Sequence, residues 1–449
     1  MKILKLKLFT RLTMMFIFIG AVVANGQETE EADPVTWDTY WSNGYNVESS
    51  DGNFKLGFGG RVMFDGVGTV SYDDSLEAFA GDAGNGTTFR RVRFFNDGTV
   101  YGNISYKLQL DFAGSSASFS DVYIQINEIP VLNYLRAGHF KEPFGLEELT
   151  SSKYISLIER SLTSPFAPSR NAGIMSGNSL FDGRMNWAAG LFRDADGAGQ
   201  AHGDWDSNLN FTGRITGTPY VNEEGDQLLH LGLAYRRVNP AEGSLSYSSG
   251  PEVRLQPSFA NTGQIENINN GNVIGTELAT VFNRFSLQGE YMRSDISRDI
   301  ELTSNNGETR EKTIDSDFSA FYVKGSAFLT SGDRRAYSSG SFGRVRPNRN
   351  FGENGGIGAL EIAMRYSRLD LIDGESEISE DGFSGSSLIA GGIVDNVSTG
   401  INWYLNPVAR VMVNYVHSGV TNSGGIDDPD EIADIGNGGF IQSRIQIDF

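Results

Sequence analysis

One segment of the chain alternates apolar and polar side chains over its whole length, and this pattern restricts the fold more than any other feature. In TVYGNISYKLQLDFAG the even positions from Ile104 to Phe112 are apolar and the odd positions are polar or charged. Successive residues of a strand point to opposite faces, so this segment has one apolar and one ionic face. About sixteen segments resemble it, near Phe54, Phe89, Val100, Ser118, Leu132, Asn171, Gly183, Ser207, Gln227, Val253, Asn272, Arg284, Asp317, Gly358, Ile389, Pro407 and Phe440.

A soluble β-sandwich also alternates, but it needs a large apolar core and few strands. Here most strands place ionisable side chains on the face opposite the apolar one. A closed barrel of about 16 strands encloses a water-filled lumen lined by polar residues, with its apolar residues facing lipid. We therefore expect an all-β fold, a transmembrane antiparallel β-barrel of about 16 strands.

The chain begins MKILKLKLFTRLTMMFIFIGAVVANGQ, with four basic residues, a short apolar run and small residues before Gln27. This predicts a signal peptide over 1–26, because the run is shorter than the roughly 20 apolar residues of a spanning helix. We expect an N-terminal periplasmic segment at 27–52 and the barrel at 53–449. The chain has no Cys, which excludes disulfides and thiol catalysis. Its net charge of -20 argues against a nucleic-acid partner.

The chain ends in GGFIQSRIQIDF, where Ile441, Ile445, Ile447 and Phe449 share one face. A last strand that ends in an aromatic carboxyl terminus is similar to the recognition signal of outer-membrane barrels. We expect the outer membrane of a Gram-negative bacterium, with its lipid and lipopolysaccharide as surroundings. The strand ending at Phe449 would contact the barrel-assembly machinery.

The segment LRAGHFKEPFGLEELTSSKYISLIERSL (135–162) starts as a strand, and its alternation stops at Pro143. Apolar residues then recur at roughly helical spacing, which suggests a short helix that packs on the barrel wall. Its cations Lys141, Lys153, Arg160 and Arg170 compete with Glu142, Glu147, Glu148 and Glu159. We interpret the region near 141–172 as an inserted loop that constricts the pore; a surface loop is the alternative.

Four stretches resemble the phosphate-selective porin O and P family. They are FKLGFGGRVMFDG with FRRVRFF, the segment from Leu135 through FAPSRNAG, the stretch from FLTSGDRRAYSSG to MRYSRLDL, and TGINWYLNPVARVMVNYVHSG. The resemblance covers nearly the whole mature chain. It implies a 16-stranded outer-membrane barrel, usually a homotrimer, whose third loop after Phe140 folds into the lumen.

The resemblance also implies site residues. Arg61, the pair Arg90 and Arg91, and Lys107 match pore cations, while Ser151 and Ser152 match hydroxyls near the constriction. The chain departs from the family twice. Glu148 stands where phosphate-specific members carry a lysine, and the mid-chain arginine cluster is reduced to Arg254, with Gln256 where a second arginine is expected.

The positions predicted to line the pore and bind anions combine these matches with reasoning from strand faces. Fixed cations and hydroxyls replace part of the hydration that an anion loses in a narrow pore. The alternative is that the cations pair with Asp111, Asp121 or other acids across the lumen. Strict alternation also sends Arg90 opposite to Arg91. The predicted set is Arg61, Arg90, Arg91, Arg93, Lys107, Arg136, Lys141, Ser151, Ser152, Lys153 and Arg254, with Glu148 as the acid of the constriction loop.

These features predict a porin for passive diffusion of small hydrophilic solutes, anionic or neutral, with a preference for anions such as phosphate. A non-conducting binding or adhesion barrel and an outer-membrane hydrolase are the alternatives. We expect no enzyme activity and no cofactor, because the four histidines are scattered and neither G-x-S-x-G nor H-E-x-x-H occurs. The stretches 194–206 and 427–434 are weak candidates for Ca²⁺ binding. The arginines of 334–349 suggest an electropositive rim or an external loop.

Overall fold

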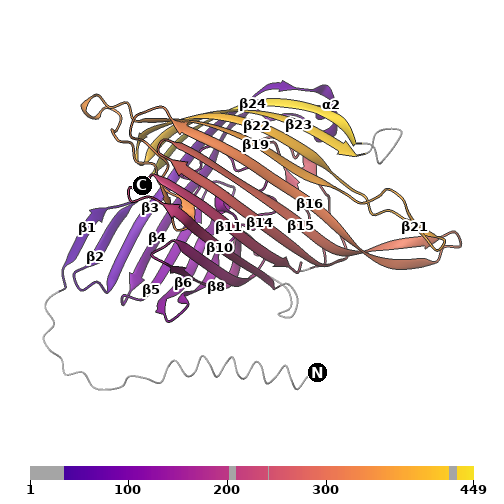
Figure 1. The fold of residues 1–449 in the computed structure, drawn as a ribbon, viewed down its shortest axis with the longest axis horizontal. Helices are drawn as coiled ribbons and strands as arrows, with labels where there is room; N and C mark the ends of the chain where they lie inside the picture. Colours follow the sequence, from indigo (N-terminus) through magenta and orange to yellow (C-terminus); the bar gives the residue numbers. More distant parts are fainter. Residues whose placement is uncertain (1–34, 202–208, 241, 424–431) are drawn as a thin grey trace, which may run out of the picture.

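The computed structural model describes residues 35–201, 209–240, 242–423 and 432–449. Sixteen of its strands form a closed antiparallel barrel (Figure 1), because the last strand pairs with the first along Gly438↔Tyr72 to Asp448↔Arg61. The barrel strands are β3 (Phe54–Tyr72), β4 (Gly86–Val100), β5 (Ile104–Asp111), β6 (Ser118–Ile129), β7 (Asn133–Lys141), β8 (Arg170–Leu180), β9 (Met185–Arg193), β10 (Asn210–Val221), β11 (Gln227–Val238), β14 (Ile268–Phe282), β15 (Phe285–Ser304), β16 (Thr309–Phe328), β19 (Ala359–Asp373), β22 (Ile389–Asn406), β23 (Ala409–Ser423) and β24 (Ile432–Asp448). The all-β expectation is thus confirmed.

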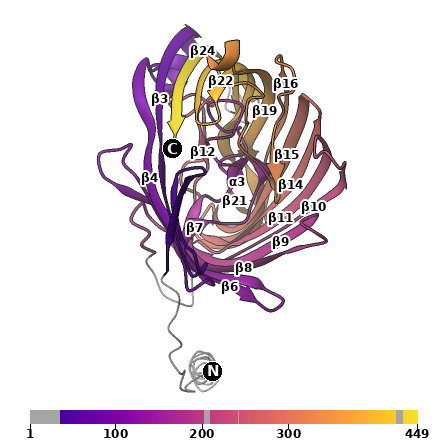
Figure 2. The ribbon, with the colours of Figure 1, turned by 90° about the vertical axis from the view of Figure 1, so that its left-hand side faces the viewer.

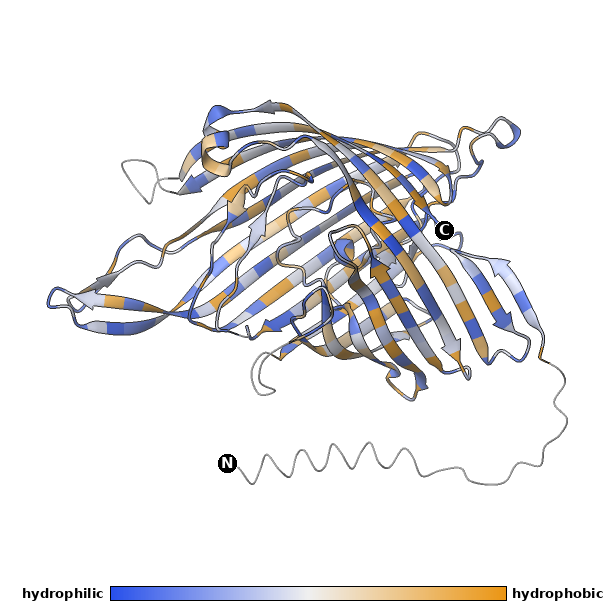
Figure 3. Cartoon of the chain, turned by 180° about the vertical axis from the view of Figure 1, so that it is seen from behind, coloured by the Kyte–Doolittle hydropathy of each residue, from blue (hydrophilic) through white to orange (hydrophobic). Residues whose placement is uncertain are grey.

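The faces of the strands follow the alternation in the sequence. On β15, Phe285 and Leu287 are exposed on the outside, while Gln288 and Glu290 are buried inside. The same alternation of apolar and hydrophilic bands runs along most strands in Figure 3. An apolar exterior over a polar interior is the arrangement that a bilayer imposes on a barrel. Among the described residues, no helix has the length and apolar composition needed to span a bilayer.

The two ends of the barrel differ. We call one the turn end, because most of its connections are short: 101–103, 130–132, 181–184, 222–226, 283–284 and 407–408. Phe449 and the hairpin of β1 (Trp37–Trp41) and β2 (Tyr45–Ser49) also lie there (Figure 1). The opposite end, the loop end, carries α2 (Asp74–Ala80) and the long β15–β16 hairpin, which pairs with β21 (Phe383–Gly385) and through it with β20 (Ile378–Glu380). Short turns face the periplasm in bacterial barrels.

The β1–β2 hairpin extends the barrel wall beyond its closure. β2 pairs with the first part of β3, from Tyr45↔Phe58 to Glu48↔Lys55, and β24 pairs with the rest. The predicted boundary at residue 53 therefore falls inside a continuous sheet. The predicted signal peptide lies outside the described residues.

Three segments fold into the barrel, whereas the sequence analysis expected one. The first inward segment (142–169) contains α3 (Leu146–Leu149). The second (242–267) contains β12 (Ser248–Ser249) and β13 (Ala260–Asn261). The third (329–358) contains β17 (Tyr337–Ser338) and β18 (Ser341–Phe342) in its inward part, whereas its 3₁₀ helix η2 (Glu353–Gly355) is exposed. Figure 2 shows α3 and β12 inside the ring of strands. The helix is a single turn, shorter than the apolar spacing suggested.

The inward segments share apolar cores with the wall. Phe144 and Leu162 of the first segment and Phe259 of the second pack in one buried cluster with wall residues such as Phe318. The strand expected near Val253 is wrong, because Val253 belongs to the second inward segment and is buried in that cluster. The apolar residues of the second inward segment face this internal cluster and not lipid.

The third inward segment joins β16 to β19 at the turn end. Its arginines therefore lie at the turn end and not in a loop of the opposite end, and Arg346 and Arg349 are exposed there. Arg335 is buried and donates to the carbonyl of Tyr154, and the Phe342 amide donates to Thr150 Oγ1, so this segment contacts the first one. Arg344 binds Asn43 of the β1–β2 hairpin.

A buried ion pair crosses the closure between β24 and β3. Arg444 Nε and Nη2 each lie 2.7 Å from a carboxylate oxygen of Asp65, and Nη1 donates to the Ile158 carbonyl at 2.9 Å. The same guanidinium lies 3.2 Å from Glu159. Arg444 thus ties the barrel closure to the first inward segment.

Replacing Arg444 with Gln should destabilise the protein by ~3–5 kcal/mol, since it leaves the buried Asp65 carboxylate unpaired. The matched control is Arg293→Gln, whose pair with Asp317 has side chains 54% and 41% exposed; this should cost under ~1 kcal/mol. Urea unfolding in detergent, followed by Trp fluorescence, measures both. Equal losses would contradict the assignment of the Asp65 pair to barrel closure.

Candidate functional site: a basic cavity in the lumen

A polar cavity of about 720 Å³ lies inside the barrel. It is bounded by the wall from β3 to β8, by the first inward segment, and by the tip of the β1–β2 hairpin at Ser42, Asn43 and Gly44. Nine cationic side chains line it: Arg61, Arg90, Arg91, Arg93, Lys107, Lys141, Lys153, Arg160 and Arg170. The acids that line it are Asp97, Asp121 and Glu148.

A β-bulge explains why Arg90 and Arg91 line the same cavity. Met63 pairs with Arg91 and Phe64 pairs with Phe89, so Arg90 is an extra residue in β4. A bulge re-aims side chains at the point where it interrupts the alternation. The expectation that Arg90 faces away from Arg91 is therefore wrong.

Most of the cations have an acidic partner. The closest nitrogen–oxygen distances are 2.7 Å for Arg90 to Glu159, 2.6 Å for Arg93 to Asp111, 3.3 Å for Lys107 to Asp97, 2.8 Å for Arg170 to Asp121 and 3.5 Å for Lys153 to Asp448. Arg93 and Lys107 pair with acids directly opposite them on the neighbouring strands β5 and β4, and not across the lumen. Glu159, Asp111 and Asp448 reach these cations from beyond the cavity lining.

Glu148 is the counterion of two cations. Lys141 Nζ lies 2.7 Å from Oε1, and Arg160 Nε lies 3.0 Å from Oε2. Burial opposes ionisation of Glu148, but Arg160 and Lys141 outweigh it and hold the pKa of Glu148 below its usual value. The acid at this position therefore stays ionised and occupies Lys141 and Arg160.

Arg61 and Arg91 have no carboxylate within 4.0 Å among the described residues, although their exposed fractions are only 8% and 5%. Arg61 Nη1 donates to Ser151 Oγ at 3.3 Å and to Ser152 Oγ at 2.9 Å. Among the described residues the side chain of Arg91 donates a hydrogen bond only to the sulfur of Met63, and its Nε has no hydrogen-bond partner. Nine cations face six acids within 4.0 Å, which leaves a net charge of +3.

The cavity brings together ten of the twelve residues that the sequence analysis named. Arg136 lies in an adjoining cavity, which shares Lys107, Asp121, Lys141 and Leu149 with the basic one. Arg254 does not line either cavity; it is exposed on the second inward segment, two residues from Gln256, which binds Gly84 between β3 and β4. The sequence analysis left Arg160 and Arg170 out of the pore-lining set; their position beside the serines of the inserted loop was the available signal.

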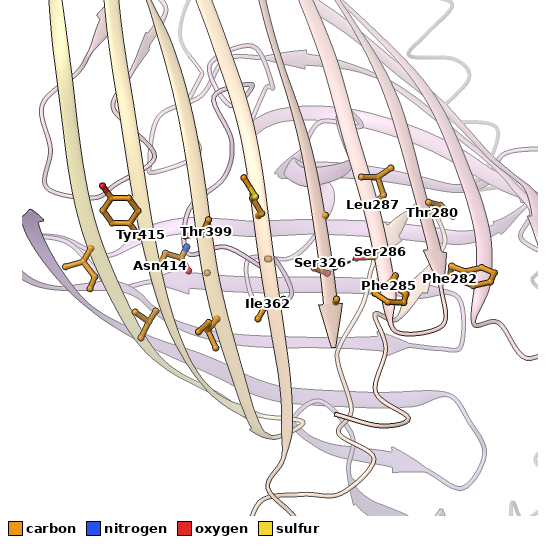
Figure 4. A pocket seen from close by; sticks show the side chains of 18 residues that line it. Thr280, Phe282, Phe285, Ser286, Leu287, Ser326, Ile362, Thr399, Asn414 and Tyr415 are labelled. Atoms are coloured by element: carbon orange, nitrogen blue, oxygen red, sulfur yellow. Dashed lines mark hydrogen bonds between the residues drawn. The ribbon is translucent and has the colours of Figure 1, made fainter. Parts of the chain in front are cut away.

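Metal binding and the outer surface of the barrel were the other places where a site could lie. The described residues hold no group of three or more His, Asp or Glu that could bind a metal ion, and both weak Ca²⁺ candidates lie partly outside them. A hollow of about 790 Å³ on the outer face of β14–β24 is lined by apolar residues such as Phe285, Leu287 and Ile362 (Figure 4). Such a surface faces the hydrocarbon of the membrane.

Comparison with known proteins establishes the family. A family model described as "Phosphate-selective porin O and P" matches residues 66–449. The chain belongs to this family. It is therefore an outer-membrane porin, and the resemblance inferred from the four sequence stretches is confirmed. The family consists of channels.

Relatives of this porin span most of its length. Porin O of Pseudomonas aeruginosa is 25% identical over 419 residues, which cover 86% of this chain and 89% of that protein. A protein of Caulobacter vibrioides is 28% identical over 346 residues, or 74% of this chain and 64% of that protein.

Solved structures support the fold. An anion-selective porin from Comamonas acidovorans superposes with a TM-score of 0.51 at 14% identity, covering 88% of this chain and all of that chain. OmpT of Vibrio cholerae superposes with a TM-score of 0.50 at 9% identity, covering 88% and 98%. At such low identity the likeness concerns the barrel alone.

Lys153 should make the charge of this porin's cavity depend on pH. Burial lowers the pKa of Lys153 to about 8; Asp448 opposes the shift, and Arg61 and Arg344 add to it. A lysine loses its charge as pH rises through its pKa, so the preference for anions over cations should fall between pH 7 and pH 9. Reversal potentials in a salt gradient measure this fall. Lys153→Arg should weaken it; an unchanged pH dependence in that variant would assign the titration to another group.

Proposed function

We propose that this porin is a passive channel for small hydrophilic solutes that prefers anions, including phosphate. The observation that carries the proposal is the pair Arg61 and Arg91, two buried cations without a carboxylate partner in a cavity of net charge +3. Fixed charges in a narrow lumen act on a passing ion with little screening. The serine hydroxyls at Arg61 supply donors that replace part of an anion's hydration shell.

The inward segments support a narrowed pore. Glu147 of the first segment binds Lys324 at 2.6 Å and Arg365 at 3.3 Å on the wall, and Glu290 accepts the amides of Leu146 and Glu147 at 2.7 Å each. Solutes would pass beside this anchored segment, along the basic wall of β3 to β8. No nucleotide, metal or covalent step is part of the proposal, so the protein acts as a channel and not as an enzyme.

The pairing of Glu148 favours a broad anion preference over strict phosphate selectivity. A lysine at this position would add a cation, whereas Glu148 engages both Lys141 and Arg160.

Four further elements remain proposals: residues 27–52 as a periplasmic segment, a homotrimer, contact with lipopolysaccharide, and recognition of the Phe449 strand by the assembly machinery. The relative named Porin O and the family description support the assignment as a porin.

The proposal is tested by single-channel recording in planar bilayers with a potassium chloride gradient. The wild type should conduct, with a reversal potential on the chloride side. Arg61→Gln and Arg91→Gln should each lower the anion preference by roughly two- to fivefold, the effect of losing ~0.5–1 kcal/mol of attraction. Arg293→Gln, on the outer face, is the control and should change nothing. Absence of conducting steps would favour a non-conducting binding barrel, and a cation-selective wild type would refute the anion preference.

A separate prediction concerns Glu148. Glu148→Gln should raise the anion preference by roughly two- to fivefold, because Lys141 and Arg160 lose their shared counterion. Glu308→Gln removes an acid at the tip of the β15–β16 hairpin and serves as the control. Reversal potentials distinguish the two variants. If Glu148→Gln behaved like the wild type, the acid would lie away from the permeation path.

A further inference from the structure

A second cavity of about 440 Å³ adjoins the basic one and differs from it in chemistry. It lies along the wall from β5 to β10, beneath Pro143 and Leu149 of the first inward segment. Lys107, Asp121, Lys141 and Leu149 line both cavities, so the two spaces lie side by side. A solute that reaches Lys107 and Lys141 thus borders both.

Aromatic side chains form one wall of this second cavity. Tyr123, Tyr134 and Phe140 line it together with Met175, and they form one cluster. Phe140 packs edge-on against Tyr123 at 6.0 Å and against Phe192 at 5.6 Å, both measured between ring centroids. These rings face the lumen, on the side of the wall that is otherwise ionic. Barrel closure does not require aromatic residues on that side.

Arg136 adds a cation to this aromatic wall. Its guanidinium carbon lies 4.1 Å from the ring centre of Tyr123, 5.3 Å from that of Phe140 and 5.5 Å from that of Tyr134. Its Nε donates to Gln125 Oε1 at 2.9 Å, and no carboxylate among the described residues lies within 4.0 Å of it. The guanidinium therefore keeps donors for a ligand while the rings hold its plane in place.

We propose that the two cavities together bind organic anions with an apolar ring, such as aryl phosphates or aryl carboxylates. Arg136, which has no carboxylate partner, would hold the charged group beside Lys107 and Lys141 of the shared boundary, and the ring would pack against Tyr123, Tyr134 and Phe140. The inference rests on the proposed channel function and specifies its substrate class. The aromatic and methionine side of the cavity supplies the surface on which an apolar ring would pack, while the opposite side carries polar residues such as Asn178, Asn186 and Thr216.

The test is block of the chloride current by added anions in planar bilayers. Phenyl phosphate should block the wild type at about tenfold lower concentration than inorganic phosphate, as expected for one additional aromatic contact. Glucose 6-phosphate, of similar charge but with a polar body, should block no better than inorganic phosphate. Tyr134→Ala should reduce the preference for phenyl phosphate to about threefold or less, and Arg136→Gln should weaken block by phenyl phosphate more than block by inorganic phosphate.

The controls separate this inference from the channel proposal. Tyr134→Phe keeps the ring and should keep the preference, which distinguishes ring contact from a folding defect. Arg61 lines the basic cavity alone. Arg61→Gln should therefore weaken block by phenyl phosphate and by inorganic phosphate alike, leaving the ratio of their blocking concentrations unchanged. Equal block by phenyl phosphate and inorganic phosphate in a conducting wild type would overturn this inference alone. Tighter block by glucose 6-phosphate would overturn the apolar-ring class, and absence of conduction would overturn the channel proposal first.

Discussion

The rest of the structure depends on the closure of the sheet between β24 and β3. No water is present in the bilayer core to satisfy a free strand edge, so each spanning backbone group must find a partner in the barrel. Closure fixes which face of every strand meets lipid, and the alternation of apolar and polar residues follows from it. The ionic residues are thereby concentrated in a lumen where they must pair with one another, with inserted segments, or with solutes.

Pairing inside the lumen divides the barrel into two halves. On the side of β14 to β24, wall residues such as Lys324 and Arg365 bind Glu147 and Glu252 of the inward segments. These wall cations are neutralised by the carboxylates of the inward segments that they bind. On the side of β3 to β8 the cations outnumber their acids, and Arg61 and Arg91 are left without one.

Much of this fold was accessible from sequence because a strand repeats every two residues, and that period can be read locally. The terminal strand, the faces of β5 and β15, and the loop after Phe140 all followed from local patterns. Register is not local, and so the bulge that turns Arg90 toward Arg91 could not be foreseen. The second and third inward segments were missed for a related reason. The local sequence around Val253 predicts a strand. Only the packing of distant segments shows that this stretch lies inside the barrel.

The last strand carries a further consequence. Asp448 binds Lys153 and Arg344, and it precedes the terminal Phe449. Asp448 lies opposite Arg61 where β24 pairs with β3, so the charge beside Lys153 depends on the closure of the barrel. The side chain of Asp448 thus contributes both to the barrel closure and to the charge of the pore. A substitution at Asp448 would therefore change both the charge of the cavity and the contacts at the barrel closure.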